Sequence, residues 1–273
     1  MRDIRDVRAQ LVVFDLDGTL LDTDNPISET TIRAIRELAH RGLQIAFASS
    51  RPLASVELFA RNVGVTAHLI GFNGASAVSA SGRQLLEKTF VLDARLAELL
   101  HRFSDTGGLV NVYRHSHWLA AGPAAAIDHE EEATGLTADS RSSAAALSGV
   151  VGSEVLKVMC RGGESACVRL LSAVPELGNL TAVSAGWDCC DIQADGVDKA
   201  RAVGELCRDL GVTPSGVVAF GDSDSDAGML QMVGYGVAVG AASAKARAAA
   251  GELIPGPGSN AVAEWLDRIA AAS

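Results

Sequence analysis

Short apolar runs alternate with amphipathic segments in the first part of the chain. Strands are expected at residues 11–14, 44–48 and 68–72. Between them, Ser28 can cap a helix whose apolar positions recur at helical spacing, and a second helix is expected to start at Pro52. This alternation of strand and helix is typical of a buried parallel sheet.

The same rhythm returns in the last third of the chain. Lys199 opens a segment with apolar residues at helical spacing, strands are expected at 217–220 and 235–239, and a final helix at 262–269. From about residue 77 to 190 the pattern loosens, with glycine pairs and stretches rich in alanine and serine. The two ends of the chain are therefore expected to form one domain, with the middle inserted into it.

Chain length and composition agree with this organisation. The 273 residues exceed what one hydrophobic core usually organises, and the 48% of apolar residues are typical of a folded protein. We expect an α/β fold with a Rossmann-like parallel-sheet core made of residues 1–77 and 191–273. Residues 78–190 are expected to form the inserted domain.

The charge balance excludes some classes of partner. With a formal net charge of −10, the chain is not expected to bind nucleic acid or an anionic membrane, because those surfaces require clustered Lys and Arg. Residues 1–10 are too charged for a signal peptide, and no apolar run approaches the roughly 20 residues of a membrane helix. The five cysteines show neither a CxxC pair nor zinc spacing. We therefore expect a cytoplasmic protein with reduced thiols.

The first predicted strand is followed directly by Asp15 and Asp17. In open α/β sheets ligands bind beyond the carboxyl ends of the strands, so this position favours a functional role. Two carboxylates at i and i+2 can have different roles: one can attack a substrate or hold a cation, and the other can transfer protons. The alternative is an ordinary Asp-Gly turn with solvated carboxylates.

Phosphate-binding groups follow two other elements. The second strand ends in Ser49 and Ser50, where a hydroxyl and exposed N–H groups beside a helix start can hold phosphate oxygens. Lys199 could offer a positive charge to a phosphate. The alternatives are a helix cap and a solvated lysine.

An acidic cluster follows the strand expected at 217–220. Asp222, Asp224 and Asp226 would repel one another unless a hard cation lies among them, and an all-oxygen ligand set suits Mg²⁺. An EF-hand loop starting at Asp222 would need Gly and Glu where the chain has Ala227 and Val233. The calcium loop is therefore excluded.

These segments, taken in chain order, resemble the four motifs of the haloacid dehalogenase superfamily of phosphatases: Asp15–Thr19 (DLDGT), Ser49, Lys199 and Gly221–Asp226 (GDSDSD). The long insertion, together with the segments 73–75 and 196–199 on either side of it, resembles the Cof-type branch with a large α/β cap.

The resemblance implies a Mg²⁺-dependent phosphatase that acts on a small phosphorylated metabolite, such as a sugar phosphate, through an aspartyl-phosphate. It implies that Asp15 is the nucleophile and that Asp17 is the general acid and then the base. It assigns Mg²⁺ to Asp15, the main-chain carbonyl of Asp17, Asp222 and Asp226. It assigns the transferring phosphoryl group to Ser49, the backbone amide of Ser50, and Lys199.

Two other functions remain open at this point: a phosphomutase with the same nucleophile, and a non-catalytic phospho-acceptor or metal-binding regulatory module. The sequence also departs from the family pattern at four positions. Ser50 and Ala200 replace usual glycines, and Ser225 and Ala241 replace usual asparagines. The change at Ser225 is expected to alter hydrogen bonding around Asp226 and Lys199.

The cap is expected to select the substrate, because the phosphoryl site itself is generic. Its most suggestive stretch runs from Val110 to Trp118, which as one strand would place Tyr113, His115 and His117 on the same face. Candidate substrate contacts are Arg51, Asn73, Tyr113, Arg114, His115 and His117. A metal site at the two histidines is not expected, because no third ligand is near in the sequence.

Two further cap features are interpreted without a function. Residues 129–132 (HEEE) are expected to form a solvated helix face, and Trp187 is expected to lie in the core.

Overall fold

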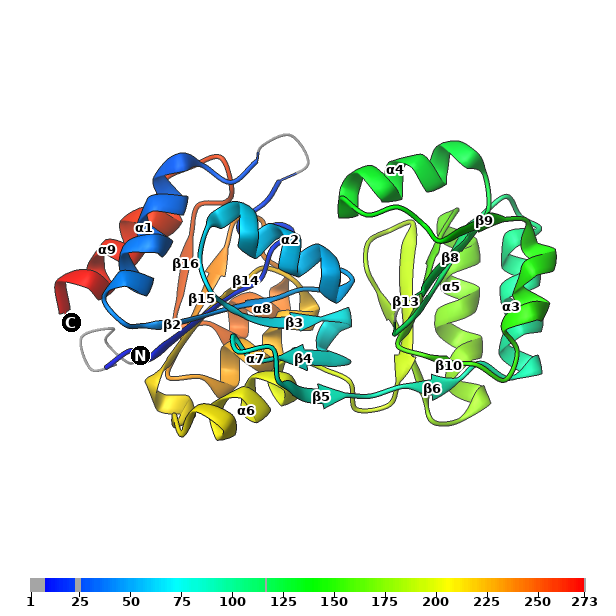
Figure 1. Cartoon of the computed structure of the whole chain (residues 1–273). Helices are drawn as coiled ribbons and strands as arrows, with labels where there is room; N and C mark the ends of the chain where they lie inside the picture. Colours follow the sequence, from blue (N-terminus) through cyan, green and yellow to red (C-terminus); the bar gives the residue numbers. More distant parts are fainter. Residues whose placement is uncertain (1–7, 23–25, 116, 273) are drawn as a thin grey trace. The chain divides into compact units, whose positions relative to one another are not determined.

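The computed structural model describes residues 8–22, 26–115 and 117–272, which divide into two compact units (Figure 1). One unit contains the described residues of 1–86 and 198–273, and the other contains 87–197. The assignment of 78–190 to a substrate-selecting cap differs from this division by several residues at each end and stays a prediction. Most of the charged segment 1–10 lies outside the described residues.

The first unit is built on an eight-stranded sheet. In spatial order its strands are β16 (Glu252–Ile254), β15 (Tyr235–Val239), β14 (Val217–Gly221), β1 (Leu11–Phe14), β2 (Gln44–Ala48), β3 (His68–Gly71), β4 (Ser76–Val78) and β5 (Gln84–Glu87). Neighbouring strands from β16 to β3 pair in parallel, and β4 pairs with β3 in the antiparallel sense. This is the parallel-sheet core that the alternating pattern predicted.

Apolar side chains cover both faces of this sheet. Alternate strand residues, such as Phe14 and Phe220, pack with three helices on one face: α1 (Glu29–His40), α2 (Leu53–Val63) and α9 (Ala261–Ala272). The intervening residues pack with three on the other: α6 (Lys199–Leu210), α7 (Ala227–Met232) and α8 (Ala244–Ala249). Because each fully buried side chain contributes roughly 1.5–3 kcal/mol, these two layers fix the sheet rigidly.

Local sequence signals explain where the elements begin and end. Ser28 caps α1 by accepting a hydrogen bond from the Thr31 N–H at 3.1 Å, and Pro52 precedes α2. The strands predicted at 11–14, 44–48 and 235–239 have these bounds in the structure. The strand predicted at 68–72 ends one residue earlier, because Phe72 has a positive φ of 53° that no strand accepts.

The second unit contains a six-stranded sheet. In spatial order its strands are β12 (Leu180–Ser184), β13 (Cys189–Ala194), β11 (Lys157–Arg161), β7 (Leu109–Arg114), β8 (His117–Ala121) and β9 (Ser140–Ser142). All neighbours are antiparallel except β8 and β9. β6 (Phe90–Val91) and β10 (Glu154–Val155) form a separate antiparallel pair.

Helices α3 (Ala94–Ser104) and α5 (Glu164–Ala173) lie on one side of this sheet in Figure 1, α3 contacting β7 and α5 contacting β13. The third helix of the unit is α4 (Ala124–Thr134).

Three predictions for the insert are wrong. The stretch 110–118 is a hairpin and not one strand, with Tyr113 opposite Trp118 and Arg114 opposite His117, so the expected face of alternating side chains does not exist. Trp187 is 76% exposed and is not a core residue. Glu130, expected on a solvated face, is buried and accepts a hydrogen bond from the Tyr113 hydroxyl at 3.3 Å.

No described helix meets the length and apolarity that a membrane crossing requires. The cytoplasmic location and the absence of a nucleic-acid partner stay predictions.

We expect the first unit to lose stability as the pH falls below about 6.5, because the buried His68 must then take up a proton. The buried ring accepts the Ala80 N–H at Nδ1 (3.1 Å), so Nε2 carries the proton and donates it to the Gln44 side-chain oxygen at 3.1 Å. Burial lowers the pKa of His68 from 6.5. The unfolded chain therefore binds more protons, and stability is lost as pH falls through 6.5 toward the folded-state pKa, by at most about 1.4 kcal/mol per pH unit.

Thermal unfolding at pH 7.5 and 5.5 would measure this loss. His68→Asn is the matched control, because its side-chain oxygen can still accept the Ala80 N–H while nothing titrates. The wild type should lose more stability between the two pH values than the variant does. Equal losses would contradict the assignment to His68.

Candidate active site

The carboxyl ends of three adjacent parallel strands meet at one edge of the first sheet. β14, β1 and β2 pair in register, so the segments that begin at Asp222, Asp15 and Ser49 leave the sheet side by side. Helix α6 begins at Lys199, with Asp198 as its N-cap. Four segments far apart in the sequence therefore converge, as the order of the motifs predicted.

Three carboxylates and one ammonium form a buried cluster at this edge. Asp15, Asp222 and Asp226 each offer an oxygen within 4.8 Å of the others. The Lys199 ammonium donates to Asp15 Oδ1 at 2.5 Å and to Asp226 Oδ1 at 2.7 Å. Asp226, Lys199 and Asp15 are only 0%, 2% and 4% exposed. Charge in this cluster is therefore poorly screened by solvent.

The environment shifts the protonation of these groups. Burial and then the Asp226 carboxylate raise the pKa of Asp15, and the same two causes raise that of Asp222. Burial alone would favour neutral Lys199, but the Asp15 and Asp226 carboxylates raise its pKa above the ordinary value, so it stays an ammonium. The raised pKa values of Asp15 and Asp222 thus reflect burial together with more carboxylate charge than Lys199 alone neutralises.

Hydrogen bonds fix the acidic loop. Asp226 Oδ2 accepts from the Ser223 N–H at 2.9 Å, the Ser223 hydroxyl at 2.7 Å and the Asp222 N–H at 3.2 Å. The Thr19 hydroxyl donates to Asp222 Oδ1 at 3.0 Å. Gly18, with φ +83°, leaves no room for a side chain, since a Cβ there would lie 2.3 Å from the Asp222 carboxylate. The DLDGT turn and the acidic loop are therefore directly in contact.

Asp17, two residues after Asp15, is exposed and is held by Arg51. The guanidinium donates two hydrogen bonds, Nε to Asp17 Oδ2 at 2.8 Å and Nη2 to Oδ1 at 2.6 Å. The Asp17 side chain is 49% exposed, so the pair contributes little stability but fixes an orientation. Ser49 is buried, and its hydroxyl accepts the Arg51 N–H at 3.1 Å.

The turn at Phe72 and Asn73, which follows β3, is hydrogen-bonded to the loop 49–51. The Asn73 N–H donates to the Ser49 carbonyl at 3.0 Å, and that of Phe72 donates to the Arg51 carbonyl at 2.9 Å. Both have positive φ, 53° for Phe72 and 57° for Asn73, a costly conformation that clusters at functional sites. The packing of this turn on the 49–51 loop holds it in place.

The candidate residues of the insert, Tyr113, Arg114, His115 and His117, lie in the second unit. Tyr113 is buried and stacks on Trp118 with ring centroids 5.4 Å apart, which leaves its ring little surface for a ligand. His115 pairs with Glu87 at 2.8 Å and His117 with Asp139 at 3.6 Å, so the two histidines face different carboxylates. Arg114, at the end of β7, also belongs to the second unit.

Two contacts were not foreseen from the sequence. The Thr19 bond to Asp222 could have been inferred only from the last letter of DLDGT, and the Arg51 bond to Asp17 from the arginine that follows Ser49 and Ser50. Ser225, where the family usually has asparagine, lies 2.8 Å from the Ser223 hydroxyl. Ala241 is exposed.

The residues present suit a hard divalent cation. The donors are all carboxylate oxygens, and three carboxylates with one ammonium leave two formal negative charges in a buried space. Asp226 already has donors on both oxygens, so Asp15 and Asp222 are better placed to ligate directly.

Comparison with known proteins gives one family. The model of the haloacid dehalogenase-like hydrolases matches residues 12–266. An HMP-PP phosphatase from Cronobacter sakazakii is 29% identical over 235 residues, which cover 85% of this chain and 84% of the relative.

Solved structures share the fold. A HAD subclass IIB sugar phosphatase superposes with a TM-score of 0.80 at 20% identity, covering 96% of this chain and 99% of its own. A HAD/COF-like hydrolase from Plasmodium vivax gives a TM-score of 0.85 at 18% identity, covering 98% and 97%. The predicted α/β fold is thereby confirmed. The chain belongs to the haloacid dehalogenase-like hydrolases, which confirms the family and the phosphatase class of enzyme predicted from its four motifs.

Proposed function

We propose that this protein hydrolyses a small phosphate monoester in two steps, with Asp15 as the nucleophile and Mg²⁺ as the cofactor. The observation that carries the proposal is the buried Asp15 carboxylate, 2.5 Å from the Lys199 ammonium and within 4.8 Å of two further carboxylates. Phosphoryl transfer depends mainly on positioning and on charge neutralisation, and this cluster supplies both.

In the first step the Asp15 carboxylate attacks phosphorus. A bond forms between the carboxylate oxygen and phosphorus, and the bond from phosphorus to the leaving-group oxygen breaks. Asp17, in its protonated form, gives its proton to that oxygen. The carboxylate that remains is the form that accepts both hydrogen bonds from Arg51. Lys199, the Ser49 hydroxyl and the Ser50 N–H neutralise and orient the transferring group.

In the second step water attacks the aspartyl-phosphate. Asp17 takes the proton from this water, the new oxygen–phosphorus bond forms, and the Asp15 carboxylate is released with inorganic phosphate. Dividing the reaction in this way replaces one difficult displacement by two easier ones.

Asp15, the main-chain carbonyl of Asp17 and Asp222 would hold Mg²⁺, with Asp226 ligating directly or through water. When bound, the ion would supply positive charge that lessens the repulsion between a phosphate and the Asp15 carboxylate.

The named activities of similar proteins suggest substrates to test, HMP-PP from one relative and sugar phosphates from another. We further propose that the insert, residues 78–190, selects among such substrates, with Arg114, His115 and His117 as the insert side chains to substitute first.

Activity is expected to require Mg²⁺. Hydrolysis of an aryl phosphate, HMP-PP and a panel of sugar phosphates should be measured with Mg²⁺ and after EDTA treatment. We expect turnover to fall at least about 100-fold without the metal, because the carboxylates then repel the substrate. Full activity in EDTA would remove Mg²⁺ from the proposal.

The same assay separates the two other functions. A phosphomutase would interconvert sugar phosphates faster than it releases phosphate. A regulatory module would show no metal-dependent turnover with any substrate.

A further inference from the structure

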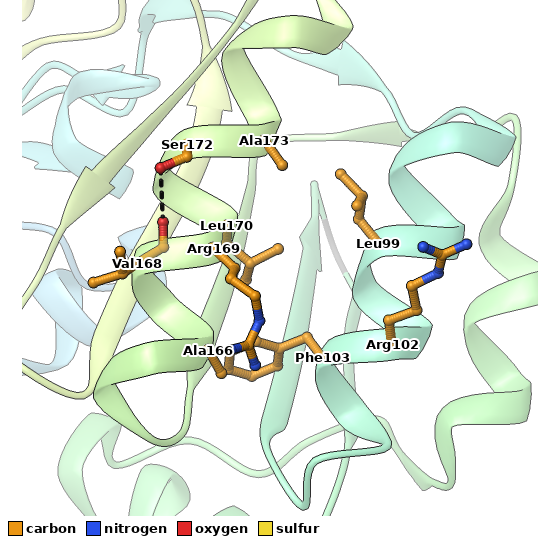
Figure 2. Close-up of a pocket in the computed structure, with 9 residues that line it drawn as sticks. All are labelled: Leu99, Arg102, Phe103, Ala166, Val168, Arg169, Leu170, Ser172 and Ala173. Carbon is orange, nitrogen blue, oxygen red and sulfur yellow. Dashed lines mark hydrogen bonds between the residues drawn. The ribbon is translucent and has the colours of Figure 1, made fainter.

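A groove between α3 and α5 of the second unit has a volume of about 460 Å³ (Figure 2). Pockets that bind small organic ligands usually measure roughly 300–1,000 Å³ and are mainly apolar with a few polar groups. This groove meets both criteria, and it takes no part in the chemistry proposed for Asp15.

Two helical stripes form its apolar walls. α5 contributes Ala166, Leu170 and Ala173, and α3 contributes Leu99 and Phe103, at spacings that place each set on one helix face. The alanines fill little of the space between the helices.

The Phe103 ring is fixed in the wall. It is 4% exposed, and it lies against Gly108 and Gly162, where a Cβ would come within 2.3 Å and 2.8 Å of the ring. A wall held in this way is preformed, so a ligand would not have to order it.

The charge on the lining has one sign. Arg102 and Arg169 are its only charged residues, and the Arg102 guanidinium donates to Glu98 at 2.9 Å. Within the described part of the chain, Arg169 has no ion pair or hydrogen bond from its side chain. Arg169 is exposed and lines the α5 side of the groove (Figure 2). In a chain of net charge −10, an unpaired guanidinium beside an apolar wall favours an anion.

We propose that this groove binds a small organic anion with an apolar body, its charged group held by Arg169. The apolar body would lie against Leu99, Phe103 and Leu170, where its burial supplies affinity. A protein partner would need a much broader surface, roughly 1,200–2,000 Å² in total, and is treated as an outcome of the test.

Fluorescence titration of the full chain with 8-anilinonaphthalene-1-sulfonate tests the proposal. Saturating inorganic phosphate should be present so that the sulfonate does not occupy the cluster at Asp15. Saturable binding to the wild type is expected, about threefold to tenfold weaker in Arg169→Gln. Ala173→Leu, which fills the groove, should weaken it at least about tenfold.

Controls make the result specific. Arg95→Gln changes an arginine of α3 that does not line the groove and that donates to the Glu176 carbonyl at 3.4 Å. Binding of the sulfonate by this variant should equal that of the wild type. The uncharged analogue N-phenyl-1-naphthylamine should bind the wild type and Arg169→Gln equally.

The proposal would be overturned if the wild type showed no saturable binding of the sulfonate. It would also be overturned if Arg169→Gln bound the sulfonate as tightly as the wild type does. A wild-type dimer in size-exclusion chromatography that Ala173→Leu converts to monomer would overturn it as well, since a second copy would then be the occupant. If Ala173→Leu unfolds, the surface change Arg169→Gln alone decides the outcome.

Discussion

Replacing Asp15 by asparagine is expected to reduce turnover at least about 10⁴-fold, the scale on which removal of a nucleophile acts in enzymes whose groups work together. The amide has nearly the same shape but cannot form the acyl-phosphate. The fold should survive, because burial and the nearby Asp226 disfavour the charged form of Asp15 and a neutral side chain relieves that repulsion. Release of phosphate from an aryl phosphate, with thermal unfolding as a check on folding, measures both effects.

Two matched variants make this result specific. Asp224→Asn changes an exposed carboxylate of the same acidic run, which pairs with Lys245 at 2.9 Å, and should keep activity within about twofold of the wild type. Asp17→Asn keeps the nucleophile, and an aryl leaving group needs little protonation. It should therefore release a burst of one equivalent of phenol and then turn over slowly. A comparable burst from Asp15→Asn would show that another residue is the nucleophile.

The core and its site followed from the sequence because local and long-range signals agree there. β1 and residues 45–48 of β2 are continuous apolar runs that Asp15 and Ser49 follow directly. The pattern of the strands and the position of the polar residues therefore point to the same edge of the sheet. The contacts made by long side chains could not be predicted from the sequence. The bond from Arg51 to Asp17 depends on how two loops approach each other, which neither segment encodes alone.

The insert was harder to interpret because its signals are weak. The stretch 110–118 contains neither an Asn-Gly pair nor another strong turn signal. The sequence pattern therefore did not predict that β7 ends at Arg114. Trp187 was expected in the core, yet it lies between β12 and β13, where its side chain is exposed. The burial of Glu130 depends on the Tyr113 hydroxyl of another element.

Replacing Lys199 by methionine is expected to lower turnover about 10²- to 10³-fold, the usual cost of losing one preorganised charge-stabilising group. Methionine fills a similar volume but removes the ammonium that bonds Asp15 and Asp226. Without it the pKa of the buried Asp15 carboxyl, which the ammonium lowers, rises further, and this group then costs more to ionise. Stability of the metal-free variant should therefore decrease as pH rises from about 5 to 8, since a raised pKa makes the folded state hold protons that the unfolded chain releases.

The matched control is Lys245→Met, in which the lost ammonium lies on α8, is exposed and pairs with Asp224 of the acidic loop. We expect its turnover to stay within about twofold of the wild type and its stability to show the wild-type pH dependence, because solvent screens that pair. Adding Mg²⁺ to Lys199→Met should restore part of the stability lost at pH 8, as the ion would neutralise the carboxylates in place of the ammonium. If the two lysine variants lose activity equally, the buried position of Lys199 is not what makes it important. If Mg²⁺ leaves the melting temperature of Lys199→Met unchanged, the carboxylates of Asp15 and Asp222 do not form the metal site.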